Sequence, residues 1–155
     1  LRVAKDKVME AYCVLVVDED DVLRRVMTGI LQTEGYRVLA TRSVREAQDL
    51  MDVFQVDALL VDCALPRRQG LALLLDSKIQ GNPVARVLLT DSEQVPEAVQ
   101  AMGTGLVHGL VLKPVLIKDL LDTVARMLGQ FHPGDELLRP RRASAMQVYD
   151  VSRAG

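Results

Sequence analysis

The sequence predicts an α/β protein in which five parallel strands form one sheet and helices cover both of its faces. Five short apolar runs alternate with five segments of helical periodicity, a pattern typical of right-handed crossover units. Four of these runs end on a residue that can handle a phosphoryl group, whereas the run around Val38 does not. Because ligands bind at the carboxyl ends of such strands, these four ends are expected to form one pocket.

The first half of the chain is expected to hold three strands, at residues 14–17, 37–40 and 57–61. Apolar residues recur at helical spacing from Val22 to Leu31, and Gly35 suits the left-handed residue that ends a helix. Ser43 and Glu46 have the spacing of a capping box, which predicts that a second helix begins there.

The second half is expected to hold three helices and two strands. A leucine-rich helix is predicted over 70–79, followed by a strand over 85–90. Pro96 suits the first turn of a short fourth helix over 95–102, and a fifth strand over 107–112 follows it. Apolar positions from Leu116 to Met127 predict the fifth helix, and a short extra helix is considered near 143–148.

Length and composition predict one globular domain at 12–128, between an N-terminal extension at 1–11 and a C-terminal tail or linker at 129–155. The net charge of −2 argues against direct nucleic-acid binding. No apolar run reaches the roughly 18 residues of a membrane span, and residues 1–6 lack a signal-peptide core. Cys13 and Cys63 lie in apolar runs, as reduced, buried thiols do, so a cytoplasmic protein is expected.

Carboxylates dominate the predicted pocket. Asp18 and Glu19 are adjacent at a strand end, where a divalent cation such as Mg²⁺ would relieve their mutual repulsion. The alternative is a solvated acidic turn that begins a helix. Asp62 follows four apolar residues and could accept a phosphoryl group as an acyl phosphate. Its alternative role is to cap the turn that follows.

Two further polar residues end the fourth and fifth strands. Thr90 alone carries little information, because threonine is common in strands. Lys113 ends an apolar strand, where an unpaired ammonium would be costly, so a carboxylate or phosphoryl partner is expected. The Lys113–Pro114 bond is a candidate for a cis peptide. The order of these residues along one sheet carries more weight than any one of them.

At these motifs the chain resembles the receiver domain of bacterial response regulators. The resemblance covers about residues 12–128, and it rests on Val16-Val17-Asp18-Glu19, Asp62-Cys63-Ala64-Leu65-Pro66 with Gly70, Leu88-Leu89-Thr90 and Leu112-Lys113-Pro114. It implies a doubly wound, flavodoxin-like receiver fold with strand order 2-1-3-4-5.

The resemblance also implies roles for individual residues. Asp62 is the expected phosphoacceptor, and Thr90 and Lys113 are expected to contact the phosphoryl oxygens. Mg²⁺ is expected to bind Asp18, Glu19, Asp62 and the backbone carbonyl of Ala64. The implied partners are a histidine kinase or phosphotransfer protein, a C-terminal output domain, and a second copy bound through the fourth helix, fifth strand and fifth helix, with no membrane contact.

The chain departs from the family pattern at several positions. Leu110 stands where the family usually has an aromatic switch residue, and Asp91 stands where it prefers a small residue after the threonine. Arg67 and Arg68 fill a loop that is more often acidic or polar, and Leu106-Val107 replaces a Gly-Ala pair. The pocket therefore matches the family, whereas the face that reports phosphorylation is atypical.

These observations favour a signalling phosphoacceptor rather than an enzyme. One alternative is a receiver-like dimerisation or docking module that works without phosphorylation, which Leu110 and Asp91 favour. The other is a flavodoxin-like or phosphatase-like enzyme. An enzyme of that kind would need a phosphate-binding loop after the first strand, where this chain has acids at 18–21.

Overall fold

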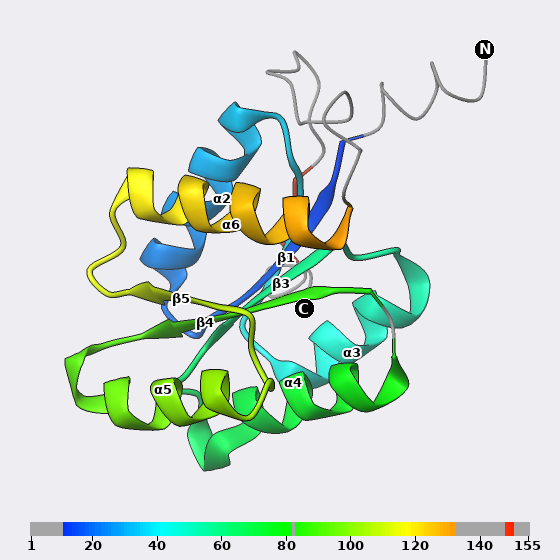
Figure 1. The fold of residues 1–155 in the computed structure, drawn as a ribbon. Coiled ribbons are helices and arrows are strands. Elements are labelled where there is room, and N and C mark those ends of the chain that lie inside the picture. The colour runs from blue at the N-terminus through cyan, green and yellow to red at the C-terminus, as the bar shows by residue number, and fades with distance from the viewer. Residues whose placement is uncertain (1–10, 82, 133–147, 151–155) are drawn as a thin grey trace.

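The computed structural model describes residues 11–81, 83–132 and 148–150. Strands and helices alternate along the chain as the sequence predicts (Figure 1). The strands are β1 (Cys13–Val17), β2 (Arg37–Thr41), β3 (Ala58–Asp62), β4 (Ala85–Thr90), β5 (Gly109–Leu112) and β6 (Val148–Asp150). The helices are α2 (Asp21–Glu34), α3 (Val44–Val53), α4 (Gln69–Gln80), α5 (Val95–Gly103) and α6 (Ile117–Phe131), with single 3-10 turns η1 (Pro66–Arg68) and η2 (Ser92–Gln94).

The sheet has the strand order β5-β4-β3-β1-β2-β6, and every neighbouring pair is parallel. The predicted order of the first five strands is therefore confirmed. A sixth strand, β6, pairs with β2 in the register Val38 to Val148. The helix considered near 143–148 is wrong at Val148, which begins this strand; residues 143–147 lie outside the described ones.

Helices cover both faces of the sheet (Figure 1). Helices α2 and α6 lie on one face, where Met27, Leu31 and Leu120 pack against Val14 and Val16. Helices α3, α4 and α5 lie on the other face, where side chains such as Leu50, Leu73 and Ala98 pack against the opposite set of strand residues, which includes Leu15 and Leu59. All the residues of β1, β3 and β4 are buried, as expected for strands that are covered on both sides. Both free cysteines are buried, and burial raises the pKa of the Cys13 thiol to about 11.

Helix α2 buries most of its predicted apolar face, but two valines at the edge of that face are exposed and one arginine is buried. Val22 and Val26 are 68% and 49% exposed, whereas Arg24, Met27 and Leu31 are buried. The helix ends as predicted, with Gly35 in the left-handed conformation at φ 107°.

The capping box that was predicted for α3 is only half formed. Ser43 Oγ accepts a hydrogen bond from the Glu46 amide at 3.0 Å, as expected for a helix N-cap. The Glu46 carboxylate does not return to the Ser43 amide but accepts the Thr41 hydroxyl at 2.7 Å. Helix α3 is thereby tied to the end of β2.

Strand β5 begins at Gly109, two residues later than the predicted start. The amide of Val107 donates to the carbonyl of Ala101, near the end of α5, and is therefore not available to the sheet. The Lys113–Pro114 peptide after this strand is cis, as the sequence suggests. None of the described helices is long and apolar enough to cross a membrane.

Candidate functional site

The sheet gathers four of the predicted residues at the carboxyl ends of its strands. Asp18 follows β1, Asp62 ends β3, Thr90 ends β4, and Lys113 follows β5. These four strands are consecutive in the order β5-β4-β3-β1, so their ends lie along one edge. In a doubly wound sheet this is the edge at which ligands bind.

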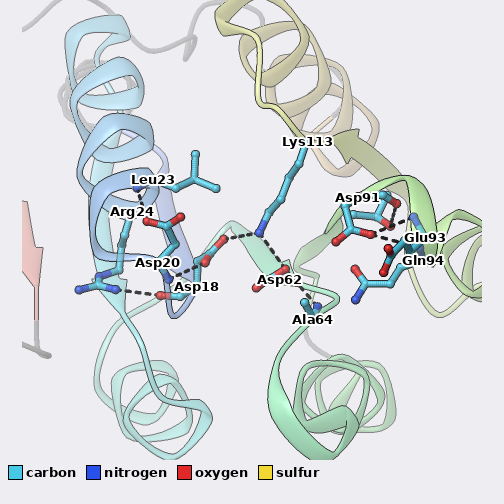
Figure 2. Close-up of polar contacts among 11 residues, drawn as sticks. Asp18, Asp20, Leu23, Arg24, Asp62, Ala64, Asp91, Glu93, Gln94 and Lys113 are labelled. Carbon is cyan, nitrogen blue, oxygen red and sulfur yellow. Dashed lines mark hydrogen bonds and ion pairs between the residues drawn. The ribbon is translucent and has the colours of Figure 1, made fainter.

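Lys113 joins the two buried aspartates (Figure 2). Its ammonium lies 3.0 Å from Asp62 Oδ1, with which it makes a hydrogen bond, and 3.1 Å from Asp18 Oδ2. The side chains of Asp18, Asp62 and Lys113 are 1%, 8% and 21% exposed. The carboxylate partner that was expected for Lys113 is therefore present, and two carboxylates share its ammonium.

Burial and charge act on this cluster in opposite directions. Removal of Asp18 from water raises the pKa of its carboxyl group, and the charge of Asp62 adds to that rise; the Asp20 amide and Lys113 only partly offset it. Burial alone would lower the pKa of Lys113, but its hydrogen bond with Asp62 and its charge interactions with both aspartates outweigh burial and raise it. The ammonium is therefore held charged, while the ionised Asp18 carboxylate is only partly compensated.

Asp18 is positioned by the first turn of α2 (Figure 2). The Asp20 amide donates to Asp18 Oδ1 at 2.9 Å, and Asp20 in turn caps the helix by accepting the amides of Val22 and Leu23. The buried Arg24 guanidinium donates to the Asp18 carbonyl at 2.8 Å. Sequence reasoning missed Arg24, although its i, i+3, i+7 spacing with Met27 and Leu31 places it on the buried face of α2.

Asp62 is held by the loop and the helix that follow it. The Ala64 amide donates to Asp62 Oδ1 at 3.1 Å. A Cβ atom on Gly70 would lie 2.7 Å from the Asp62 carbonyl oxygen and 2.8 Å from Val61 Cγ1. Only glycine therefore lets α4 begin this close to the end of β3.

Thr90 lies at the same edge, but its hydroxyl is directed elsewhere. The side chain is fully buried, and Oγ1 donates to the Asp91 carbonyl at 3.1 Å. The Asp91 carboxylate is also engaged, because Oδ1 accepts the amides of Glu93 and Gln94 and caps η2 (Figure 2). Leu110 is half-buried and packs against the core on the α3–α4–α5 face.

The donors at this edge suit a hard cation. Asp18 Oδ2 is buried and, within the described part of the chain, accepts no hydrogen bond, although Lys113 lies beside it. Carboxylate oxygens with free lone pairs are ligands that Mg²⁺ prefers. Glu19 and Ala64 are exposed beside the two aspartates. The structure does not gather the Glu19 carboxylate with the others: no group of three His, Cys, Asp or Glu side chains among residues 11–81, 83–132 and 148–150 is arranged to hold a metal.

Known proteins share both the sequence pattern and the fold. Residues 14–125 match the family described as the response regulator receiver domain. The response regulator MprA of Mycolicibacterium vanbaalenii is 30% identical over 139 residues, which cover 90% of this chain and 58% of MprA. The sensory/regulatory protein RpfC of Xanthomonas campestris pv. campestris is 30% identical over 114 residues, which cover 72% of this chain and 16% of RpfC.

The fold comparison agrees. A CheY-like response regulator receiver domain protein from Methanospirillum hungatei JF-1 superposes with a TM-score of 0.72 at 23% identity, covering 79% of this chain and 98% of that one. This likeness concerns the fold alone, and the chain spans only part of the curated relatives that it matches. The match over residues 14–125 nevertheless covers most of the chain, which therefore belongs to the response regulator receiver domain family of two-component signalling systems.

Proposed function

We propose that Asp62 accepts a phosphoryl group from the phosphohistidine of a histidine kinase or phosphotransfer protein. One observation carries this proposal: the Lys113 ammonium lies between two buried carboxylates at the ligand-binding edge of the sheet. An acceptor carboxylate at that edge needs a neighbouring cation, because a phosphoryl donor is itself an anion. Receiver domains are signalling domains rather than enzymes of the usual kind, and the proposal keeps that role.

Each residue of the cluster has a distinct part in the proposed transfer. An oxygen of the Asp62 carboxylate attacks phosphorus as the P–N bond to the donor imidazole breaks. Lys113 keeps one contact with Asp62 and stabilises the charge that builds on the phosphoryl oxygens. The Thr90 hydroxyl exchanges the Asp91 carbonyl for a phosphoryl oxygen. The α5–β5–α6 face then changes its packing and alters an output domain, a partner or a homodimer contact.

Receiver domains generally bind Mg²⁺ at the acidic phosphorylation site, and the buried carboxylate oxygens of Asp18 and Asp62 are of the kind that this ion prefers. Asp18, Asp62, Glu19 and the backbone carbonyl of Ala64 are the proposed ligands. The bound ion would neutralise charge on the incoming phosphoryl group. Asp18 is the residue for which this matters most, since its buried carboxylate is otherwise compensated only in part. A histidine kinase partner would place the domain in the cytoplasm.

Phosphorylation by a small donor tests this proposal. The protein is incubated with acetyl phosphate and Mg²⁺, and its intact mass is measured beside Asp62→Asn and a sample containing EDTA. The expected result is the gain of one phosphoryl group by the wild-type protein with Mg²⁺ alone. An unchanged wild-type mass, or an equal gain in Asp62→Asn, would contradict the proposal.

A second candidate is a docking or dimerisation module that works without phosphorylation. Its specific support is that the Thr90 hydroxyl is already bonded to the Asp91 carbonyl and that Leu110 replaces an aromatic residue. A Mg²⁺ titration followed by thermal unfolding separates the two candidates. A phosphoacceptor site should be stabilised by Mg²⁺ in a way that Asp18→Asn abolishes, whereas a docking module should not respond.

A further inference from the structure

Helix α5 is held firmly at its C-terminal end. Three consecutive carbonyls there accept hydrogen bonds from cationic side chains: Lys78 Nζ donates to Thr104 at 3.1 Å, and Arg86 donates to Gly105 at 3.3 Å and to Leu106 at 2.7 Å. Arg86 is only 6% exposed. Cations at a helix C-terminus also interact favourably with its dipole. This end of α5 is therefore anchored to α4 and to β4.

The N-terminal end of α5 is held less firmly than its C-terminal end, by one ion pair with the turn η1 that follows Asp62. Arg68 Nε lies 3.4 Å from Glu97 Oε1, and the two side chains are 80% and 31% exposed. Arg68 belongs to the turn that follows Asp62, where it has a left-handed backbone at φ 56°. The Glu97 Oε1 atom is buried, but the Arg68 guanidinium is exposed and can exchange this partner for another one at little cost. The segment that carries the acceptor is thus tied to α5 by a contact that is easily broken.

The turn that carries Arg68 also lies close to the acceptor. Arg68 ends this turn two residues before Gly70, where an added Cβ would lie 2.7 Å from the Asp62 carbonyl oxygen, so Arg68 and its partner Glu97 stand near the end of β3. A phosphoryl group carries a charge of about −1.5 to −2, more than the carboxylate that it modifies. Phosphorylation would therefore repel Glu97 and attract Arg68.

We propose that Arg68 couples the charge on Asp62 to helix α5. On phosphorylation the guanidinium leaves Glu97 and binds the phosphoryl oxygens, and the N-terminal turn of α5 moves away while its anchored C-terminus stays in place. This coupling rests on the proposed function. It supplies a route for the signal that does not need an aromatic residue at Leu110, and Arg68 acts in it as a positioning residue.

Hydrogen exchange with beryllofluoride as the phosphoryl mimic tests the coupling. Exchange is measured by mass spectrometry on the full chain with Mg²⁺, free and at saturating beryllofluoride, with attention to residues 95–103. The wild-type protein should exchange about five-fold faster in the N-terminal half of α5, at the amides that follow Pro96, when beryllofluoride is bound. This is the change expected from losing one weak contact. Arg68→Gln and Glu97→Gln should exchange at the faster rate in both states.

Arg67→Gln is the matched control, because it removes the same charge from the neighbouring residue, which has the same φ of 56°. It should respond as the wild type does. Protection around Asp62 with α5 unchanged, or an Arg68→Gln variant that responds like the wild type, would overturn the coupling while leaving the acceptor proposal standing. The absence of any saturable beryllofluoride effect in the wild type would overturn both.

Discussion

The pocket formed by Asp18, Asp62 and Lys113 differs in its construction from the neighbouring residues 90–110. Residues 90–110 are called the reporting segment, because they would report phosphorylation of Asp62. The pocket consists of buried charges, with Asp18 and Asp62 sharing Lys113. In the reporting segment, the Thr90 hydroxyl donates to the Asp91 carbonyl and Leu110 packs against apolar neighbours. The difference follows the resemblance to the receiver family, which is close at Asp18, Asp62 and Lys113 and departs at Asp91 and Leu110.

The largest predicted effect comes from removing the shared cation. Lys113→Met leaves two buried carboxylates without their ammonium, so we expect a loss of roughly 3 kcal/mol in the free energy of unfolding at neutral pH. Urea denaturation measures this loss. Because a divalent cation would replace the missing charge, Mg²⁺ should restore part of the stability. Lys118→Met, at an exposed position of α6, is the control and should change stability little.

This loss of stability in Lys113→Met is expected only if both aspartates of the pocket are ionised. A Lys113→Met protein as stable as the wild type at neutral pH would mean that the two aspartates are not both ionised. The contrast between a pocket held by buried charges and a reporting segment in which Thr90 and Leu110 make uncharged contacts would then fail.

A slightly smaller effect is expected at the contact between α4 and the end of β3. Gly70→Ala places a Cβ against the Asp62 carbonyl and Val61, which must shift, at a cost of about 1–3 kcal/mol. The same shift should reduce phosphoryl uptake from acetyl phosphate. Gly29→Ala is the matched control, because a Cβ there meets nothing within 4 Å, and it should stabilise α2 by about 0.5–1 kcal/mol. Equal behaviour of the two variants would show that the close approach has no consequence.

Asp18→Asn is expected to stabilise the metal-free protein. The pKa of Asp18 is raised above its ordinary value of 3.8, so the folded state binds this proton more tightly than the unfolded chain does. The stability of the wild-type protein therefore falls as pH rises from 3.8 through the raised pKa of Asp18. Because the amide of Asp18→Asn does not ionise, the variant should avoid that loss. Its free energy of unfolding at neutral pH should be higher by roughly 1 kcal/mol. The gain should vanish when the pH is lowered towards 3.8. A variant less stable than the wild type at neutral pH would contradict this account of Asp18.

The smallest effect is expected in the reporting segment. Thr90→Val keeps the shape of the side chain but removes one hydrogen bond to the Asp91 carbonyl, at a cost of about 0.5–1 kcal/mol. Phosphorylation of Asp62 should still be detectable in this variant, with a changed lifetime of the product. Complete loss of phosphorylation would mean that Thr90 belongs to the receiving pocket and not to the reporting segment.

Much of the fold could be predicted, because the alternation of apolar runs and helical segments leaves few topologies open. The same topology brings Asp18, Asp62 and Lys113 together, although they are far apart in the sequence. Strand β6 could not be predicted, since three residues in a weakly patterned tail reveal no partner. On α2, the exposure of Val22 and Val26 and the burial of Arg24 were not predicted, because hydrophobicity alone favours burial of the valines. Hydrogen bonding to the Asp18 carbonyl holds Arg24 inside.

Hydrogen-bond partners were the least predictable part of the site. Nothing in the sequence indicates that the Thr90 hydroxyl donates to the Asp91 carbonyl. Nor does it indicate that the Glu46 carboxylate accepts the Thr41 hydroxyl and not the Ser43 amide. Several acceptors lie within reach of each such side chain, and the packing around it selects one. The sequence could therefore predict which groups meet at the pocket, but not which hydrogen bonds the side chains of the reporting segment make.

Chemical trapping tests most directly whether Asp62 is the acceptor. After incubation with Mg²⁺ and acetyl phosphate, borohydride reduces an acyl phosphate to an alcohol, which converts the modified aspartate to homoserine, and peptide mapping then locates it. We expect homoserine at position 62 only, and none when EDTA is present. Homoserine at Asp18 or Asp91 in place of Asp62, or no conversion at all, would contradict it.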